Sequence, residues 1–185
     1  MGSAGGEMDA EICARARALG EQIAKNDCII MTGACPGLPH EAVKGAKENG
    51  GLIVGVSPAL SLDEHITRYA SPYEEYDVLI FTGDGLMGRE VESIRSCDIV
   101  AIVGGRSGTL GEFAIAYDEG KLIAVLLDTD GIADHIEEIV AMIDKDTAAE
   151  VIYDADPERL VTRALEAHQA RVQAGIAYKF PALDG

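Results

Sequence analysis

The chain has 185 residues, and 32 acidic residues against 15 basic ones give it a formal net charge of −17. This length suits one domain with a complete hydrophobic core, so we expect residues 1–185 to form a single domain. Nucleic acids and anionic membranes are bound through clustered Lys and Arg, so this charge balance argues against both as partners. Since the sequence has neither a membrane-spanning apolar run nor an export signal, we expect a cytoplasmic protein.

Short apolar runs alternate with helix-like segments almost to the end of the chain. In order, the patterns predict a helix at 8–25, a strand at 28–31, a helix at 39–48, strands at 52–56 and 78–81, a helix at 87–97, a strand at 99–103, a helix at 109–119, a strand at 122–127, a helix at 131–144, a strand at 151–153 and a helix at 157–173. Residues 59–76 lack clear periodicity and are expected to form a long connection. We expect the tail from Gly175 to be loose or to dock on a partner.

The expected fold class is α/β. Strands of continuous Val, Ile and Leu that are separated by helices indicate a mainly parallel, doubly wound, Rossmann-like sheet with helices on both faces. The first seven residues resemble a loop that follows a strand. Either the first strand of the fold is missing, or the sequence starts inside a longer reading frame, or this segment is a flexible tail.

A glycine-rich loop follows the apolar run at 99–103 and leads directly into a helix. Glycines let the backbone approach a ligand closely, and the free N–H groups at a helix start suit a phosphate. We therefore predict that this loop binds a phosphate-bearing ligand through Gly104, Gly105, Arg106, Ser107, Gly108 and Thr109. For Arg106, the alternative is a solvated loop side chain.

Glu112 lies in the first turn of the helix that follows this loop. A carboxylate at that position is placed to stabilise a positive sugar centre, to orient a ribose hydroxyl or to direct water. Its alternative role is only to complement the positive end of the helix dipole.

The four cysteines form no CxxC pair, and no histidine lies at ligand spacing, so we expect reduced thiols and no metal site. Cys35 lies in a glycine-containing loop before a helix, a position that favours a thiolate. We nevertheless expect Cys35 to be an unreactive thiol, and a reactive thiolate is the alternative.

The run at 103–112 resembles the Pro-Gly-Gly-x-Gly-Thr-x-x-Glu signature of the Rossmann-like "possible lysine decarboxylase" family. That family includes the Lonely Guy phosphoribohydrolases, which activate cytokinins, and a bacterial branch related to molybdenum cofactor carrier proteins. Here Val103 replaces the proline, and one extra residue precedes Gly108. Both departures resemble the carrier-related branch. Lysine decarboxylation itself finds no support, because no pyridoxal-phosphate lysine constellation is visible.

The resemblance also implies roles for residues outside this run. Gly33 and Gly37 match the family's second ligand loop, and Arg89 matches the catalytic arginine of the phosphoribohydrolases. Those enzymes have a lysine where this chain has Glu90, which weakens the transfer of that role. The alternative for Arg89 is a surface salt bridge, and Arg95 is a second candidate for its function.

Two functions follow from these patterns. The first is a binding or carrier protein for a nucleotide or a molybdopterin-like cofactor, with no cofactor required for its own chemistry. The alternative is a phosphoribohydrolase that cleaves the N-glycosidic bond of a nucleoside 5′-monophosphate, with Glu112 and Arg89 as catalytic residues. The resemblance also implies a homo-oligomer built from dimers.

Overall fold

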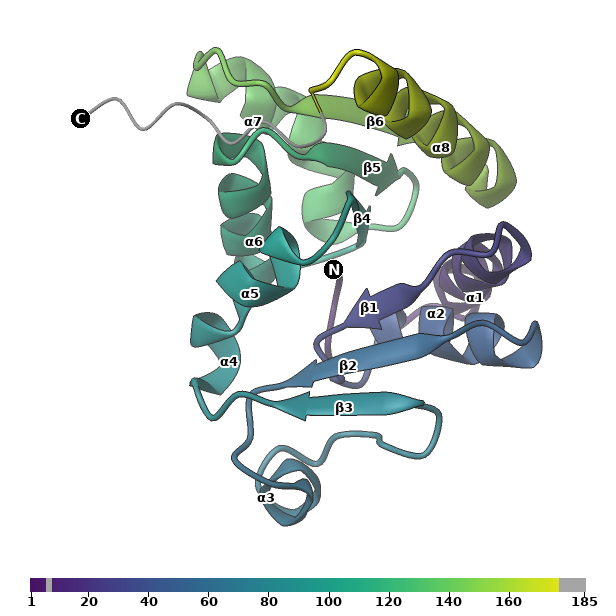
Figure 1. Ribbon diagram of the computed structural model, residues 1–185, viewed down its shortest axis with the longest axis vertical. Helices are drawn as coiled ribbons and strands as arrows, with labels where there is room; N and C mark the ends of the chain where they lie inside the picture. The colour runs from purple at the N-terminus through teal and green to yellow at the C-terminus, as the bar shows by residue number, and fades with distance from the viewer. Residues whose placement is uncertain (6–7, 177–185) are drawn as a thin grey trace.

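The computed structural model describes residues 1–5 and 8–176, and its helices and strands alternate along the chain (Figure 1). In chain order the elements are α1 (Ala10–Lys25), β1 (Ile30–Thr32), α2 (Leu38–Glu48), β2 (Ile53–Ser57), α3 (Leu62–Thr67), β3 (Val78–Phe81), α4 (Gly85–Gly88), α5 (Glu90–Arg95), β4 (Ile99–Val103), α6 (Ser107–Asp118), β5 (Leu122–Leu126), η1 (Gly131–His135), α7 (Ile136–Ile143), β6 (Glu150–Asp154) and α8 (Pro157–Gln173). In the described part of the chain, no helix has both the length and the apolarity that a membrane crossing requires.

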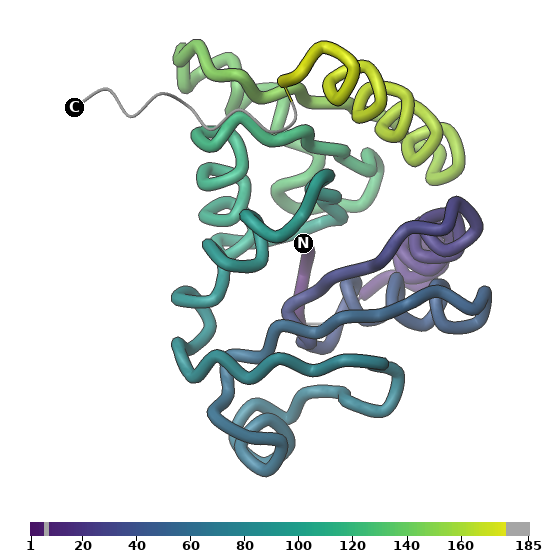
Figure 2. The backbone as a smooth tube through the Cα atoms, in the orientation of Figure 1, coloured from purple at the N-terminus to yellow at the C-terminus, as the bar shows by residue number. Residues whose placement is uncertain are grey.

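The strands form two parallel sheets of three strands each, in the orders β1-β2-β3 and β4-β5-β6. The chain's first residues lie between β1 and β4 (Figures 1 and 2). Gly2 forms one parallel bridge with Val103, and the Val103 N–H donates to the Met1 carbonyl at 3.0 Å. These residues therefore lie beside β4, in the place expected for a first strand. The predicted α/β, doubly wound, parallel fold is confirmed.

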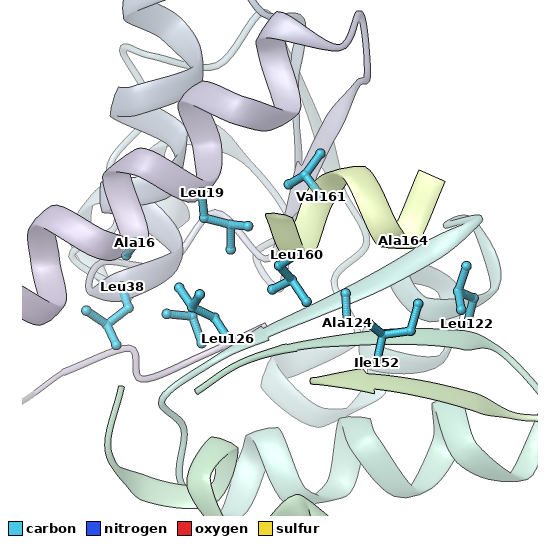
Figure 3. Close-up of a cluster of buried hydrophobic side chains, with 11 residues drawn as sticks. Ala16, Leu19, Leu38, Leu122, Ala124, Leu126, Ile152, Leu160, Val161 and Ala164 are labelled. Carbon is cyan, nitrogen blue, oxygen red and sulfur yellow. The ribbon is translucent and has the colours of Figure 1, made fainter. Parts of the chain in front are cut away.

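The β4–β6 sheet is covered on both faces because its strands are apolar on both sides. On one face, α1 and α8 contribute Leu19 and Leu160 to a cluster with Leu126 of β5 (Figure 3). On the other face, Phe113 of α6 and Ile136 of α7 pack in a second cluster with β4 and β5. All five residues of β5 are buried. This half of the molecule is a three-layer core that fixes the loops at its strand ends.

The β1–β3 sheet has one smaller cluster of buried residues, formed with α1 and α2. These two helices approach closely through glycines. A Cβ atom at Gly20 would lie 1.8 Å from the Ala42 carbonyl oxygen, and one at Gly45 would lie 1.9 Å from the Arg17 carbonyl oxygen. The α1–α2 contact therefore requires residues without side chains at these crossing points.

Three elements differ from the sequence expectations. Residues 59–76 contain α3, which is stabilised locally: the Ser61 hydroxyl accepts from the Glu64 N–H at 3.2 Å, and the Glu64 carboxylate accepts from the Leu60 N–H at 2.7 Å. The predicted helix at 87–97 is divided into α4 and α5 at Arg89, and the one at 131–144 begins as the 3-10 helix η1. Most of the tail from Gly175 lies outside the described residues.

Candidate functional site

The glycine-rich loop after β4 is held in place by hydroxyl groups from two distant segments. Gly104 and Gly105 have φ angles of 59° and 115°, which other residues adopt only with strain. The Gly104 N–H donates to Thr129 Oγ1 at 2.9 Å, and the Gly105 N–H donates to Ser3 Oγ at 2.8 Å. Because both N–H groups are used inside the protein, these two glycines shape the loop rather than donate to a ligand.

The N–H groups that follow Gly105 in the chain are available to an anion. Helix α6 begins at Ser107 without a side-chain cap, and the N–H groups of residues 106–109 have no acceptor within the described residues. The Thr109 side chain is buried against Gly105. The Arg106 side chain is exposed and donates to the Gly5 carbonyl. The predicted anion site therefore narrows to residues 106–109, where binding stays a prediction.

One hollow adjoins this loop at Arg106, and a second hollow, lined by no loop residue, adjoins the first. The nearer one has a volume of about 90 Å³ and is lined by Ser3, Gly5, Met8, Asp9, Ile12, Leu38, Arg106, Thr129 and Asp130. The second, of about 390 Å³, shares Asp9, Ile12 and Asp130 with the first. A ligand at the start of α6 thus has open space beside Arg106.

Arg89 lies at the junction of α4 and α5 and is only 7% exposed. Its guanidinium group rests on the backbone of Gly33, where a Cβ atom would be 1.8 Å from Arg89 Nη1. Nη2 donates to Cys35 Sγ at 3.4 Å, Nε has no partner, and no carboxylate of the described residues lies within ion-pair distance. The surface salt bridge considered for Arg89 is therefore wrong. A surface salt bridge is instead formed by Arg95, whose exposed side chain places Nε 2.7 Å from Glu119 Oε1.

Two carboxylates lie near Arg89, one on each of two helices. Glu90 of α5 is 7% exposed, and its Oε1 and Oε2 atoms lie 3.9 Å and 3.7 Å from the positions of Cβ atoms at Gly108 and Gly111 of α6. Burial, together with the neighbouring charge of Glu112, raises the pKa of Glu90 to about 7, against the opposing effect of Arg89. Burial also raises the pKa of Glu112, while the Met1 ammonium group and Arg89 act to lower it.

Glu112 is thus part of a partly buried charged cluster with Arg89 and Glu90. Because α6 begins at Ser107, Glu112 lies in the second turn of the helix and not in the first turn as expected, and its role stays a prediction. Sequence reasoning noted Glu90 only as a departure from the family pattern. The signal for its place in the site was its position directly after Arg89. Ser3 and Thr129 were missed because no local motif marks them.

The remaining predicted residues hold the backbone around the site. A Cβ atom at Gly37, which has a φ of 97°, would lie 2.1 Å from the Ser3 carbonyl oxygen, so this glycine permits contact with the N-terminal segment. For Cys35, burial raises the thiol pKa despite the nearby Arg89, so the thiolate considered as an alternative is not favoured. Ligand binding by Gly33 and Gly37 stays a prediction.

Parallel strands, a glycine-rich loop at the sheet edge and a charged cluster beside it define a Rossmann-like protein with a candidate ligand site at its strand ends. The chain matches the model of the SLOG cluster4 family over residues 1–161 and belongs to that family. The resemblance inferred from the sequence is thereby confirmed.

Two solved structures and one relative are similar to this chain. The molybdenum cofactor carrier protein MCP from Chlamydomonas reinhardtii has a TM-score of 0.73 and 31% identity, over 92% of this chain and 96% of that one. The molybdenum cofactor binding protein from Rippkaea orientalis shares the fold, with a TM-score of 0.65 and 24% identity over 87% of this chain and 90% of that one. An uncharacterized protein of Archaeoglobus fulgidus is 36% identical over 121 residues, which is 65% of this chain and 74% of that protein.

Proposed function

We propose that this protein binds a phosphate-bearing ligand, a nucleotide or a molybdopterin-like cofactor, at the start of α6 and acts as its carrier. The main support is that the N–H groups of residues 106–109 lack acceptors within the described residues. These residues follow a loop that Ser3 and Thr129 hold in place. Unpaired N–H groups at the positive end of a helix bind phosphate. The likeness to a molybdenum cofactor carrier protein at 31% identity supports a cofactor as the ligand.

The residues present suit the organic and phosphate parts of such a cofactor. The start of α6 offers donors to a phosphate, and the buried Nε of Arg89 has no partner among residues 1–5 and 8–176. No group of three or more His, Cys, Asp or Glu in the described residues is arranged to hold a metal ion. In this proposal, the cofactor is cargo, and the protein contributes binding and shielding.

Ser107 offers a direct test, because it is the first residue of α6. Proline is tolerated at that position and removes its N–H group, and the extended Arg106 before it is compatible with a following proline. We expect Ser107→Pro to weaken pyrophosphate binding about tenfold or more, measured by calorimetry, through loss of one hydrogen bond to a charged group. Ser107→Ala keeps the N–H group and is the matched control. Equal pyrophosphate affinity in both variants would refute the site.

Hydrolysis of nucleoside monophosphates is the competing outcome, based on Arg89 and Glu112. We favour carriage because Glu90 places a carboxylate where the phosphoribohydrolases have a cation. Incubation with AMP and related monophosphates should give tight binding without free base. Base release that Glu112→Ala abolishes would favour the enzyme instead.

We also infer that the protein forms a homo-oligomer built from dimers. Apolar side chains on β3 and α4 support this, because Val78, Ile80, Leu86 and Met87 are 46%, 46%, 53% and 67% exposed. Light scattering coupled to gel filtration should give a mass of at least two chains, and a single-chain mass at micromolar concentration would contradict the inference.

A further inference from the structure

The loop between β5 and η1, residues 127–130, has a strained backbone. Asp128 and Asp130 have φ angles of 56° and 60°, in a region that residues other than glycine adopt only with strain. The ψ angle of Asp130 is 175°, and this combination with a φ of 60° is found almost only for glycine. Such angles persist only where the surrounding structure holds the backbone in place.

Asp134 of η1 holds this loop through one carboxylate. Its Oδ1 atom accepts from the Asp128 N–H at 2.7 Å, and its Oδ2 atom accepts from the Asp130 N–H at 2.9 Å. The carboxylate therefore binds the backbone at both of the residues with a positive φ. Hydrogen bonds to a carboxylate are stronger than those to a neutral acceptor, which suits a side chain that must hold a strained backbone.

Thr129 connects this loop to the glycine-rich loop. Its side chain is buried, and its Oγ1 atom accepts from the Gly104 N–H at 2.9 Å and donates to the Leu126 carbonyl at 2.6 Å. Because Asp128 and Asp130 flank Thr129, their backbone angles set the direction of its side chain. A change in these angles would move the acceptor away from the Gly104 N–H.

The backbone of η1 holds the same two glycines through their carbonyl groups. The Ala133 N–H donates to the Gly104 carbonyl and the Ile132 N–H donates to the Gly105 carbonyl, each at 3.0 Å. A Cβ atom at Gly131 would lie 2.3 Å from the Gly105 carbonyl oxygen, so the two backbones are in direct contact. The loop at 127–130 and η1 together therefore support the glycines that precede residues 106–109.

We propose that Asp134 is a positioning residue of the phosphate site. Asp134 lines neither hollow, so it acts by fixing the loop at 127–130 and, through Thr129, the glycine-rich loop. The effect on binding rests on the proposed function. The effect on the bond between Thr129 and Gly104 depends on no ligand.

Asp134→Ala tests the effect on binding. We expect pyrophosphate affinity, measured by calorimetry, to fall about five- to tenfold, because the strained loop loses both of its acceptors. Asp134→Asn keeps one acceptor oxygen and should give a smaller loss, and it serves as the test if the alanine variant fails to fold. Asp146→Ala, which removes an exposed carboxylate outside this loop, is the matched control and should leave the affinity unchanged.

Glycine at positions 128 and 130 separates positioning from a general loss of stability. Glycine adopts the observed angles without strain, so the loop no longer needs the carboxylate of Asp134. In a protein that carries both Asp128→Gly and Asp130→Gly, Asp134→Ala should therefore change pyrophosphate affinity by less than about twofold. A loss of the same size with and without the two glycines would refute the positioning role.

Hydrogen exchange separates this inference from the proposed function. The Gly104 amide should exchange at least about fivefold faster in Asp134→Ala than in the parent protein, because Thr129 no longer holds it. If pyrophosphate binds and Asp134→Ala changes neither affinity nor exchange, the positioning role is refuted and the phosphate site stands. If the parent protein binds no pyrophosphate, the proposed function fails. Faster Gly104 exchange then still supports the hold by Asp134, and unchanged exchange refutes it.

Discussion

The two halves of the molecule are built from the same strand–helix units but are covered differently. Every residue of β5 is buried between two helical layers, whereas Val78 and Ile80 of β3 are each 46% exposed. The candidate site draws on both halves: the glycine-rich loop comes from the doubly covered sheet, and Gly33 comes from the other. The difference shows how a doubly covered half can fix the glycine-rich loop while a more open half supplies the surroundings.

The largest expected effect is in the doubly covered half. Ile123 of β5 is 0% exposed, so Ile123→Ala should lower the free energy of unfolding by about 3–4 kcal/mol, measured by urea denaturation. The same truncation at Ile80 of β3 should cost less than about 1 kcal/mol when measured at a concentration where the chain is monomeric, because that side chain is 46% exposed in the single chain. Equal losses at both positions would remove the contrast between the halves.

The contact between α1 and α2 gives the next effect. In Gly45→Ala the new methyl group would meet the Arg17 carbonyl oxygen, which is backbone and cannot move aside cheaply. We expect a loss of about 1–3 kcal/mol in unfolding free energy. Lys44→Ala, at a half-buried position of the same helix whose side chain pairs with Glu41, is the control and should change stability by less than about 1 kcal/mol. A neutral Gly45→Ala would mean that the helices lie further apart.

The Thr129 hydroxyl group, which holds the glycine-rich loop, can be removed without changing the shape of the side chain. Thr129→Val leaves the buried Gly104 N–H without its acceptor and should cost about 1–3 kcal/mol in thermal unfolding experiments. Pyrophosphate affinity should fall as well, because the loop is no longer fixed. A stable variant with unchanged affinity would show that the loop needs no such support.

The smallest expected effect is on the pH dependence of stability, which should differ between Glu90 in the candidate site and a carboxylate outside the site. The folded-state pKa of Glu90, about 7, lies above that of an unfolded glutamate, so the folded protein loses stability as pH rises from about 4 to 7. Glu90→Gln should therefore raise the melting temperature by about 2–4 °C at pH 8 and have little effect at pH 4.

Asp154 should behave in the opposite way. Arg159 and Arg163 hold its pKa well below the usual range, so its stabilisation is present above about pH 4 and is lost as pH falls below that. Asp154→Asn should lower the melting temperature at pH 7, and its difference from the parent protein should shrink as pH falls below about 4. Parallel pH profiles for the Glu90 and Asp154 variants would contradict these assignments.

Elements with strong periodicity were predictable from sequence: β3 and α8 have the predicted bounds, at 78–81 and 157–173. Helix α3 was missed because local capping by Ser61 and Glu64, rather than apolar periodicity, stabilises it. The break at Arg89 was missed because its guanidinium group is placed by Gly33, a tertiary contact.

The residues of the candidate site also divide into those that the sequence indicates and those that it does not. Motifs indicated Arg89, Glu112 and the loop at 104–109. The hydroxyls that occupy the Gly104 and Gly105 N–H groups come from 25 and 102 residues away, and no local pattern reports such partners.

The central claim is that the start of α6 binds an anion, and amide chemical shifts test it most directly. Nitrogen–hydrogen correlation spectra recorded with and without pyrophosphate should show the largest shifts at Arg106, Ser107, Gly108 and Thr109, with small changes at Gly104 and Gly105. Unchanged amides at residues 106–109, with shifts confined to the hollow around Asp9 and Asp128, would contradict the account.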